Sequence, residues 1–235
     1  MKNLPFVSSL LPRRLTALCI LAAASFATSA TVNAFVIGPT GEKWGSPVFG
    51  TGASVTYSFM GGGISMAAEG YGPSVALDTF MPAGYKAAIK AAFDAWSAVA
   101  DITFTEVADG GEAFNAPGAS GDIRIGAHSF DGAGGVLAHG YYPNSIFPNA
   151  AGDIHFDSDD AWDLEFDGSA DGFNIFQVFA HEVGHAIGLD HTDVPDSLLN
   201  PFYTEAFVGL QADDIAGAQF IYGRRSAPPP PRVPD

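Results

Sequence analysis

The sequence predicts an α+β domain of five short strands and three helices. Its 235 residues are 47% hydrophobic, so the chain is long and apolar enough to bury a full core. Short β-rich runs alternate with Gly, Pro and Asn breaks, and three longer segments place apolar residues at helical spacing. The length favours one globular domain, with a tail at each end.

Five segments have the length and composition of strands. They are rich in β-branched and aromatic residues, and turn residues bound them. The loops between the later segments contain many glycines and aspartates, which build turns and offer oxygen ligands to cations. The predicted strands cover residues 55–59, 102–107, 122–127, 136–142 and 153–157.

Three segments have the period of a helix. The first, residues 83–100, follows Pro82, which suits the first turn of a helix. Its Phe93 and Trp96 lie on the apolar face, and we expect them to pack in the core. The other two predicted helices cover residues 174–189 and 212–222.

The first residues have the layout of a secretory signal peptide. Basic residues precede an apolar run, residues 15–27, and small residues follow it. A membrane anchor is the rival interpretation, but this run is shorter than the roughly 20 residues that cross a bilayer. We therefore expect residues 1–34 to be a signal peptide, with cleavage near residues 30–34, and the protein to be secreted to the periplasm or outside the cell.

The rest of the chain divides into a domain and a tail. Residues 35–223 carry all the predicted strands and helices, whereas residues 224–235 include four consecutive prolines, which form a stiff, exposed extension. The only cysteine, Cys19, lies in the expected leader, so the mature protein forms no disulfide. We expect the core and bound metal to supply its stability.

The mature protein is expected to be strongly acidic. All 26 acidic residues but only seven of the ten basic residues lie beyond the leader, which gives a net charge of −19. Such a surface disfavours nucleic acid and anionic membranes as partners. It suits bound cations, since clustered carboxylates are calcium ligands. We expect a monomer with no nucleic-acid partner and no membrane span in the mature chain.

The segment that carries the chemistry reads HEVGHAIGLDH and covers residues 181–191. Residues four apart lie on one face of a helix, so His181 and His185 can bind one ion. Gly188 allows a sharp turn of the backbone that brings His191 to the same ion. One histidine on an apolar helix is usually a core residue, but chance explains the full pattern poorly.

Three histidines with an open fourth position are typical of a catalytic zinc, whereas structural zinc sites have four protein ligands. Zinc lowers the pKa of a bound water towards about 7 and polarises a carbonyl group. Glu182 lies beside the first ligand, so we expect it to accept the proton of the water and pass it to the leaving amine. The predicted reaction is hydrolysis of an amide bond without a covalent intermediate.

This motif resembles the metzincin zinc peptidases, and its surroundings resemble the matrixin, or matrix-metalloproteinase-like, family. The resemblance covers residues 46–223 and implies a metzincin catalytic domain with a twisted five-stranded mixed sheet and three helices. It implies a secreted zinc-dependent metalloendopeptidase that acts on protein or peptide substrates. The matching stretches are AAFDAWSAVADITFTEV, FDGAGGVLAHGYYP, GDIHFDSDDAW and QADDIAGAQFIYG.

The resemblance also implies where a substrate binds. A peptide would pair as an extra strand with an edge strand of the sheet. A Pro-x-Tyr segment after the motif matches the wall of the family's specificity pocket. These substrate-binding positions are Val136, Leu137, Ala138, Pro201, Phe202 and Tyr203.

The chain departs from the family at two points. Leu199 stands where the family has the methionine of the turn beneath the zinc. This swap conserves volume, so we expect a small packing cost and retained function. No cysteine follows Cys19 to hold the zinc in a latent form, so we expect control by an inhibitor, a compartment or another mechanism.

The resemblance further implies a second, structural zinc. His128, His139 and His155 lie in segments that match the family's structural site, which uses three histidines and one aspartate. The loop after His128 is shorter than the family's. The aspartate ligand has no clear counterpart in this sequence.

A neighbouring calcium site is implied in the same way. Asp131, Asp157 and Asp160 match family ligand positions, and Asp160 stands where the family has glutamate. Aspartates together with carbonyl groups of glycine loops are the hard oxygen ligands that calcium prefers. We expect zinc and calcium as cofactors.

Two other functions stay open at this stage. One is a catalytically inactive zinc- and calcium-binding extracellular protein on the same fold, which Glu182 disfavours because a structural site needs no general base. The other is a hydrolase of a different zinc clan, with a downstream glutamate as third ligand. Glu205 is the only glutamate after the motif, and its surroundings, FYTEAF, show no clear helical period.

Overall fold

The computed structural model describes residues 34–39, 41–167 and 172–225, all within one compact unit. The expected signal peptide, apart from Ala34, and the prolines of the tail lie outside these residues. The described elements are β1 (Val36–Ile37), β2 (Ala53–Phe59), the 3-10 helix η1 (Leu77–Thr79), α1 (Tyr85–Val99), β3 (Ile102–Glu106), β4 (Ile123–His128), β5 (Ala138–Gly140), β6 (Ile154–Asp157), β7 (Trp162–Asp163), β8 (Phe173–Asn174), α2 (Ile175–Ala186), β9 (Leu189–Asp190) and α3 (Ala212–Tyr222).

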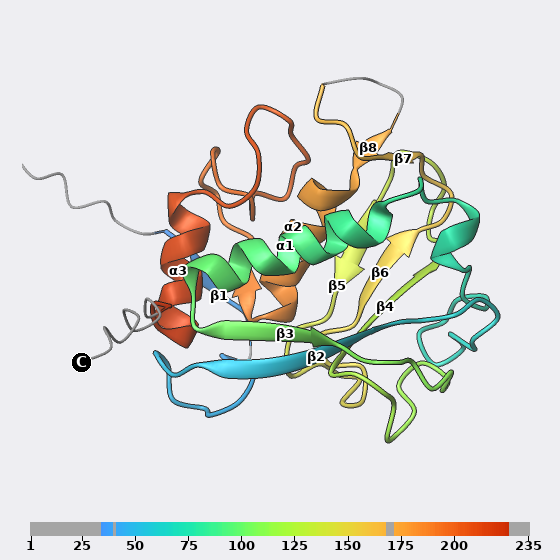
Figure 1. Cartoon of the computed structure of the whole chain (residues 1–235), viewed down its shortest axis with the longest axis horizontal. Coiled ribbons are helices and arrows are strands. Elements are labelled where there is room, and N and C mark those ends of the chain that lie inside the picture. Colours follow the sequence, from blue (N-terminus) through green and yellow to red (C-terminus); the bar gives the residue numbers. More distant parts are fainter. Residues whose placement is uncertain (1–33, 40, 168–171, 226–235) are drawn as a thin grey trace, which may run out of the picture. The chain divides into compact units, whose positions relative to one another are not determined.

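The main sheet is mixed and has five strands in the order β3-β2-β4-β6-β5 (Figure 1). β2 pairs in parallel with β3 and β4, and β4 pairs in parallel with β6. β5 is an edge strand and runs antiparallel to β6, which places His139 opposite His155. The predicted α+β class, with a five-stranded mixed sheet and three helices in the described residues, is confirmed.

Helices α1 and α2 lie over the sheet and pack against each other (Figure 1). The rings of Phe93 and Phe179 meet edge to face, with centroids 5.0 Å apart. The indole N–H of Trp96 donates to the backbone oxygen of Ala180 over 2.9 Å, so this buried donor is satisfied inside the core. Phe93 and Trp96 are both buried, as predicted.

The central strands are covered on both faces. All six residues of β4 and all four of β6 are buried. Arg124 in β4 is buried too, and its Nε and Nη2 each donate to the carboxylate of Asp109 over 2.8 Å. This paired geometry compensates part of the cost of burying the charge.

Two predicted elements begin two residues later than expected. α1 starts at Tyr85, because Gly84 before it has a left-handed φ of 103° and the Tyr85 N–H donates to the oxygen of Pro82 in a preceding turn. The predicted strand 136–142 is reduced to β5, because the Val136 N–H bonds the Asp131 side chain instead of a neighbouring strand. The short pairs β1–β9 and β7–β8 were not predicted, since two-residue strands leave no periodic pattern.

The N-terminal part of the domain supports the end of α2. β1 pairs antiparallel with β9, and the Gly38 N–H donates to the oxygen of Gly188 over 2.9 Å. The indole N–H of Trp44 donates to the oxygen of Ala186, the last residue of α2, over 2.7 Å. These bonds fix the chain where it leaves α2 and turns.

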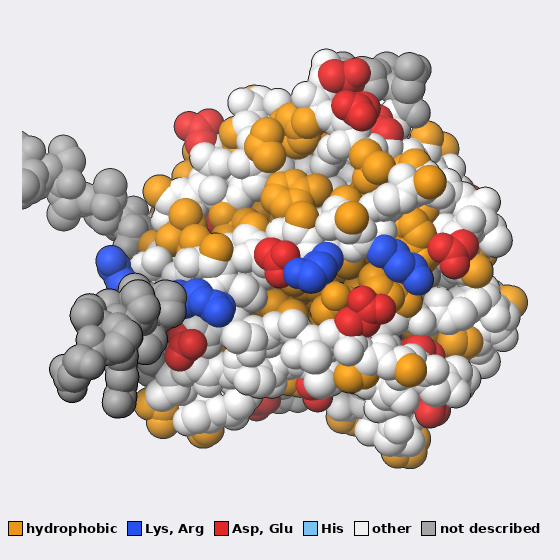
Figure 2. All heavy atoms as spheres, viewed as in Figure 1, with side chains coloured by type: hydrophobic (Ala, Val, Ile, Leu, Met, Phe, Trp, Pro, Cys, Tyr) orange, Lys and Arg blue, Asp and Glu red, His pale blue; other side chains and the backbone are white. Residues whose placement is uncertain are grey.

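The surface in view in Figure 2 carries scattered acidic groups, whereas basic groups gather along α1 and beside the end of α3. Lys90 and Asp94 form an exposed i, i+4 pair on α1, with Nζ and Oδ2 2.6 Å apart. Such exposed pairs contribute little to stability. Among the described residues, no helix is both long and apolar enough to span a membrane.

Candidate active site

The end of α2 and the turn after it assemble three histidines. Asn174 caps the helix by accepting the Gln177 N–H, and one helical turn separates His181 from His185. After α2 ends, Gly188 adopts the predicted left-handed conformation, with φ of 104°. A side chain there would place its Cβ 2.8 Å from the oxygen of Glu42, so only glycine fits this turn.

The three Nε2 atoms of this cluster converge on one point. The distances are 3.2 Å for His181–His185, 3.1 Å for His181–His191 and 3.1 Å for His185–His191. In a tetrahedral zinc site with bonds of about 2.0 Å, ligand atoms lie about 3.3 Å apart. The observed triangle therefore has the size that zinc requires.

Hydrogen bonds at the far side of the rings show which nitrogens carry lone pairs. Nδ1 of His181 lies 2.7 Å from the oxygen of Leu198, and Nδ1 of His185 lies 2.9 Å from the oxygen of Leu189. A carbonyl oxygen can only accept, so both Nδ1 atoms are protonated and both Nε2 atoms present lone pairs. Burial lowers the pKa of His181 to about 3 and that of His185 to about 4, which keeps both neutral at pH 7.

Glu182 lines the same cleft but is not one of the side chains whose ligand atoms form this triangle, and it is only 6% exposed. Burial raises its pKa to about 8, although a backbone hydrogen bond from Gly140 opposes the shift. A cation nearby would favour its charged form. Gly140 lies so close that a Cβ on it would be 2.7 Å from the Glu182 backbone oxygen, so glycine lets β5 approach α2.

A cleft of about 400 Å³ opens over the cluster. His181, Glu182 and His191 lie in its wall, and His191 is exposed. The residues expected to contact a substrate all line this one cleft: Val136, Leu137, Ala138, Pro201, Phe202 and Tyr203. The apolar side chains of Val178, Leu198 and Phe207 also line it.

Gln177 lies in the cleft wall and was not predicted as a site residue. Its Oε1 accepts the Gly209 N–H over 2.8 Å, and its Nε2 donates to the oxygens of Thr204 and Phe207 over 3.2 and 3.3 Å. All three of these side-chain hydrogen bonds link α2 to the same loop. The wall is thus a fixed surface, although that loop contains no helix or strand.

Leu199 occupies the turn beneath the histidines, as predicted. It is buried, and a Cβ added to Gly184 of α2 would lie only 2.5 Å from its Cδ2. The side chain thus packs directly on the helix backbone between His181 and His185. Because a Cβ at position 184 would clash with the Leu199 side chain, this contact requires glycine at that position.

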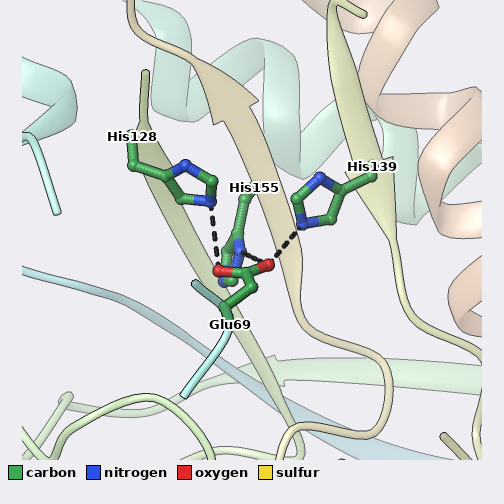
Figure 3. Close-up of side chains that lie close together, drawn as sticks. All are labelled: Glu69, His128, His139 and His155. Carbon is green, nitrogen blue, oxygen red and sulfur yellow. Dashed lines mark hydrogen bonds and ion pairs between the residues drawn. The ribbon is translucent and has the colours of Figure 1, made fainter. Parts of the chain in front are cut away.

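The second group of histidines lies at the β4, β5 and β6 edge of the sheet and closes on a carboxylate (Figure 3). Oε1 of Glu69 is 2.7 Å from Nε2 of His139 and 3.1 Å from Nδ1 of His155, and its Oε2 is 3.1 Å from Nε2 of His128. The three predicted histidines therefore come together. The fourth partner is a glutamate from a distant loop instead of an aspartate.

The chemistry of this group fits a metal better than a set of ion pairs. Nδ1 of His128 lies 3.3 Å from the oxygen of Ser129, and protonation of this Nδ1 leaves Nε2 as the nitrogen that can bind a metal. Burial lowers the pKa of His155 to about 4, so it is neutral at pH 7. Burial alone would raise the pKa of Glu69, but hydrogen bonds from the three histidines lower it well below its usual range. A cation bound among these four side chains would satisfy the carboxylate and the ring nitrogens together.

One sequence signal could have identified Glu69. It is the only charged residue between Lys43 and Asp78, in a stretch rich in glycine and apolar residues. An isolated carboxylate in such a stretch indicates a specific structural or functional role. Its side chain is 3% exposed.

The three predicted calcium ligands are near one another but are not gathered as tightly. In the described part of the chain, the groups whose ligand atoms lie within 4.8 Å are the two histidine clusters. Asp157 and Asp160 are buried, and the Oδ2 of each has no hydrogen-bond partner there. Burial and the charges of Asp157, Asp131 and Asp159 raise the pKa of Asp160.

Glu205 does not join the catalytic histidines. The ligand group there consists of His181, His185 and His191, and Glu205 accepts a hydrogen bond from the Tyr203 hydroxyl. The structure therefore gives no support to a third ligand from Glu205. This removes the basis for the alternative interpretation as a hydrolase of a different zinc clan.

An open three-histidine site beside a buried glutamate, over a cleft in an α+β fold, is typical of metal-dependent hydrolases. The matrixin sequence profile matches residues 75–223. Stromelysin-3 of Xenopus laevis is 40% identical over 155 residues, which are 62% of this chain and 29% of that protein. Matrix metalloproteinase-16 of Homo sapiens is 41% identical over 161 residues, which are 63% of this chain and 25% of that protein.

The chain belongs to the matrixin family, whose members are zinc metalloendopeptidases. The predicted family is thereby confirmed. The chain matches less than a third of the length of the two relatives. Its own activity and substrates are therefore treated below as proposals.

Replacing Leu199 by Met tests the packing beneath the histidines. Because the swap conserves volume and adds no polar group, we expect a change of about 1.5 kcal/mol or less in the free energy of unfolding. Peptide cleavage should stay within a few-fold of wild type. Urea unfolding and cleavage rates measure both quantities, and complete loss of activity would show that the turn is organised differently.

Proposed function

We propose that this protein is a secreted zinc-dependent endopeptidase in which His181, His185 and His191 hold the catalytic zinc and Glu182 is the general base. The observation that carries the proposal is the convergence of three Nε2 atoms at 3.1–3.2 Å beside a buried carboxyl group. Membership of the matrixin family supports it. The open cleft provides access for a substrate.

Zinc held by the three histidines would supply Lewis-acid activation of a water molecule and of the scissile carbonyl group. Glu182 accepts the proton that the water loses. Its burial stabilises the protonated carboxyl group, so the proton can then pass to the amine of the leaving peptide. The Leu198 and Leu189 carbonyl groups keep two imidazoles in the ligating tautomer throughout.

An extended peptide is the substrate that fits the cleft. Ala138 begins the edge strand β5, Val136 and Leu137 lead into it, and a peptide can add to this edge as a further strand. The pocket between α2 and the loop that contains Pro201 and Tyr203 is largely apolar. We infer that it takes an apolar side chain of the substrate.

The organisation of the whole chain is part of the proposal. Residues 1–34 act as a signal peptide, residues 35–223 as the catalytic domain and residues 224–235 as an exposed tail. The basic and apolar pattern of the leader supports export, to the periplasm or outside the cell. We propose that the mature protein is a monomer.

We also propose two metal sites that stabilise the fold. His128, His139, His155 and Glu69 would hold a second zinc, and four protein ligands make that site closed and structural. The carboxylates of Asp131, Asp157 and Asp160 would share a calcium ion. The unpartnered Oδ2 atoms of two of them support this role.

Glu182→Gln tests the mechanism. The amide keeps the size of the side chain but cannot accept the proton, so turnover should fall by about a hundredfold or more. Zinc content at the catalytic site should match wild type, as measured by atomic emission. Glu106→Gln, at an exposed carboxylate on β3, is the control and should cleave normally.

Cleavage by Glu182→Gln near the wild-type rate would rule out this general base. A wild-type protein that binds zinc but cleaves no member of a peptide library would instead favour the inactive metal-binding alternative. The two outcomes are therefore distinguishable.

Glu69→Ala tests the second zinc site. Removal of the carboxylate leaves three neutral ligands, so zinc content after dialysis should drop from about two ions per chain to about one. Zinc at the catalytic cluster should be retained, and Glu106→Ala should keep both ions. A wild-type content of a single zinc would contradict the second site without affecting the first.

The calcium proposal predicts ion-dependent stability. With calcium removed, the carboxylates of Asp157 and Asp160 repel each other, so the melting temperature should fall in a calcium-selective chelator and recover on addition of calcium. Asp157→Asn should reduce this response. A melting temperature that does not depend on calcium would contradict the proposal.

A further inference from the structure

The ring of His191 is less restrained than the rings of the other two histidines of the catalytic cluster. Nδ1 of His181 and Nδ1 of His185 each bond a backbone carbonyl group. In the described part of the chain, no such bond reaches Nδ1 of His191, and this residue is exposed. The position of its ring therefore depends on how the backbone of His191 is held.

Asp190 holds that backbone. Its Oδ1 accepts the N–H of His191 over 2.7 Å. The same oxygen accepts the hydroxyl of Tyr142 over 2.8 Å, so the phenol and the His191 N–H share one acceptor. Asp190 lies at the end of β9, where β1 pairs with it. A continuous path of hydrogen bonds thus runs from Tyr142 through the carboxylate of Asp190 to the third histidine.

Tyr142 is itself held by the chain around α2. Its ring meets the ring of His185 edge to face, with centroids 5.7 Å apart. A Cβ on Gly38 would lie 2.8 Å from Cδ1 of Tyr142, so glycine there lets the segment after β1 approach the phenol ring. The backbone oxygen of Tyr142 accepts the Gly152 N–H over 3.3 Å. These contacts fix the direction in which the hydroxyl points.

The hydroxyl gives Asp190 a permanent donor. Burial, together with the carboxylate of Asp190, raises the pKa of Tyr142, so the phenol stays protonated at neutral pH. Hydrogen bonds to a carboxylate are stronger than those between neutral groups. Asp190 is only partly buried, so without this donor its side chain could rotate into water. The His191 N–H would then lose its acceptor.

We propose that Tyr142 is a positioning residue for the catalytic zinc: its hydroxyl, acting through the carboxylate of Asp190, fixes the backbone of His191 and hence the direction of its ring. The proposal rests on the zinc-binding role of the three histidines. Among the described residues, those that line the cleft do not include Tyr142. We therefore expect it to act on the metal site and not on the substrate.

The test is the rate at which zinc leaves the catalytic site for a chromogenic chelator, in the full-length protein. The catalytic phase is the one absent from His181→Ala. Tyr142→Phe keeps the ring and removes only the hydroxyl, so Asp190 loses its donor and we expect this phase to be about fivefold faster or more. A catalytic phase at the wild-type rate would overturn the proposal.

Tyr85→Phe is a matched control. Tyr85 on α1 also donates its hydroxyl to an aspartate, Asp78, over 2.8 Å, but this bond joins α1 to η1. Its loss should lower the melting temperature and leave the catalytic phase unchanged. Equal acceleration in Tyr85→Phe and Tyr142→Phe would mean that zinc release follows the stability of the whole domain, and it would overturn the positioning role.

A double-mutant cycle tests the path through Asp190. Asp190→Ala removes the shared acceptor and should speed the catalytic phase at least as much as Tyr142→Phe does. The double variant should release zinc no faster than Asp190→Ala, because the hydroxyl then has no carboxylate to act through. Independent effects of the two changes would overturn this path. If Asp190→Ala does not fold, Tyr142→Phe and its control decide the proposal.

Failure of the positioning role and failure of the proposed function give different results. Faster zinc release from Tyr142→Phe, in a protein whose wild type cleaves no peptide, would support the positioning role and contradict the endopeptidase alone. Zinc release with no phase that depends on His181 would contradict both.

Discussion

Lone pairs on neighbouring nitrogen atoms repel one another unless a cation lies between them, and the candidate active site holds three imidazole nitrogens within 3.2 Å of one another. At least two are unprotonated, because the Nδ1 atoms of His181 and His185 donate to carbonyl oxygens. An arrangement this unfavourable without a metal must be enforced by its surroundings. The structure around α2 can be understood as the set of restraints that enforces it.

Those restraints come from backbone groups and from close approaches that glycine permits. Gly188 turns the chain after α2, and β9 pairs with β1 to hold the returning segment. Gly140 and Gly184 let β5 and Leu199 come against the helix, where any side chain would clash. Because the ligands are held through main-chain contacts, the side chain at position 199 can differ from the family's methionine without loss of the site's geometry.

Features that depend on residues close together in the sequence could be predicted from it. Features that depend on contacts between distant residues could not. The 181–191 motif contains its own spacing and its own turn residue, so helix period and Gly188 were enough to place His181, His185 and His191. Glu69 lies far in the chain from the histidines that it contacts, and these tertiary contacts are not contained in any periodic pattern. Strand 136–142 was predicted too long for a related reason, because the Asp131 side chain takes the Val136 N–H. The resemblance to matrixins identified the three histidines at the sheet edge, but not the carboxylate that completes them.

Both histidine clusters lead to one claim, which is that metal ions are structural components of this domain. The most direct test is X-ray diffraction from crystals of the zinc-loaded protein at wavelengths on either side of the zinc absorption edge. The account predicts an anomalous peak about 2.0–2.1 Å from Nε2 of His181, His185 and His191, with no Glu182 oxygen in the ligand shell. Absence of a peak between these three nitrogens, or a peak with Glu182 as a direct ligand, would contradict it.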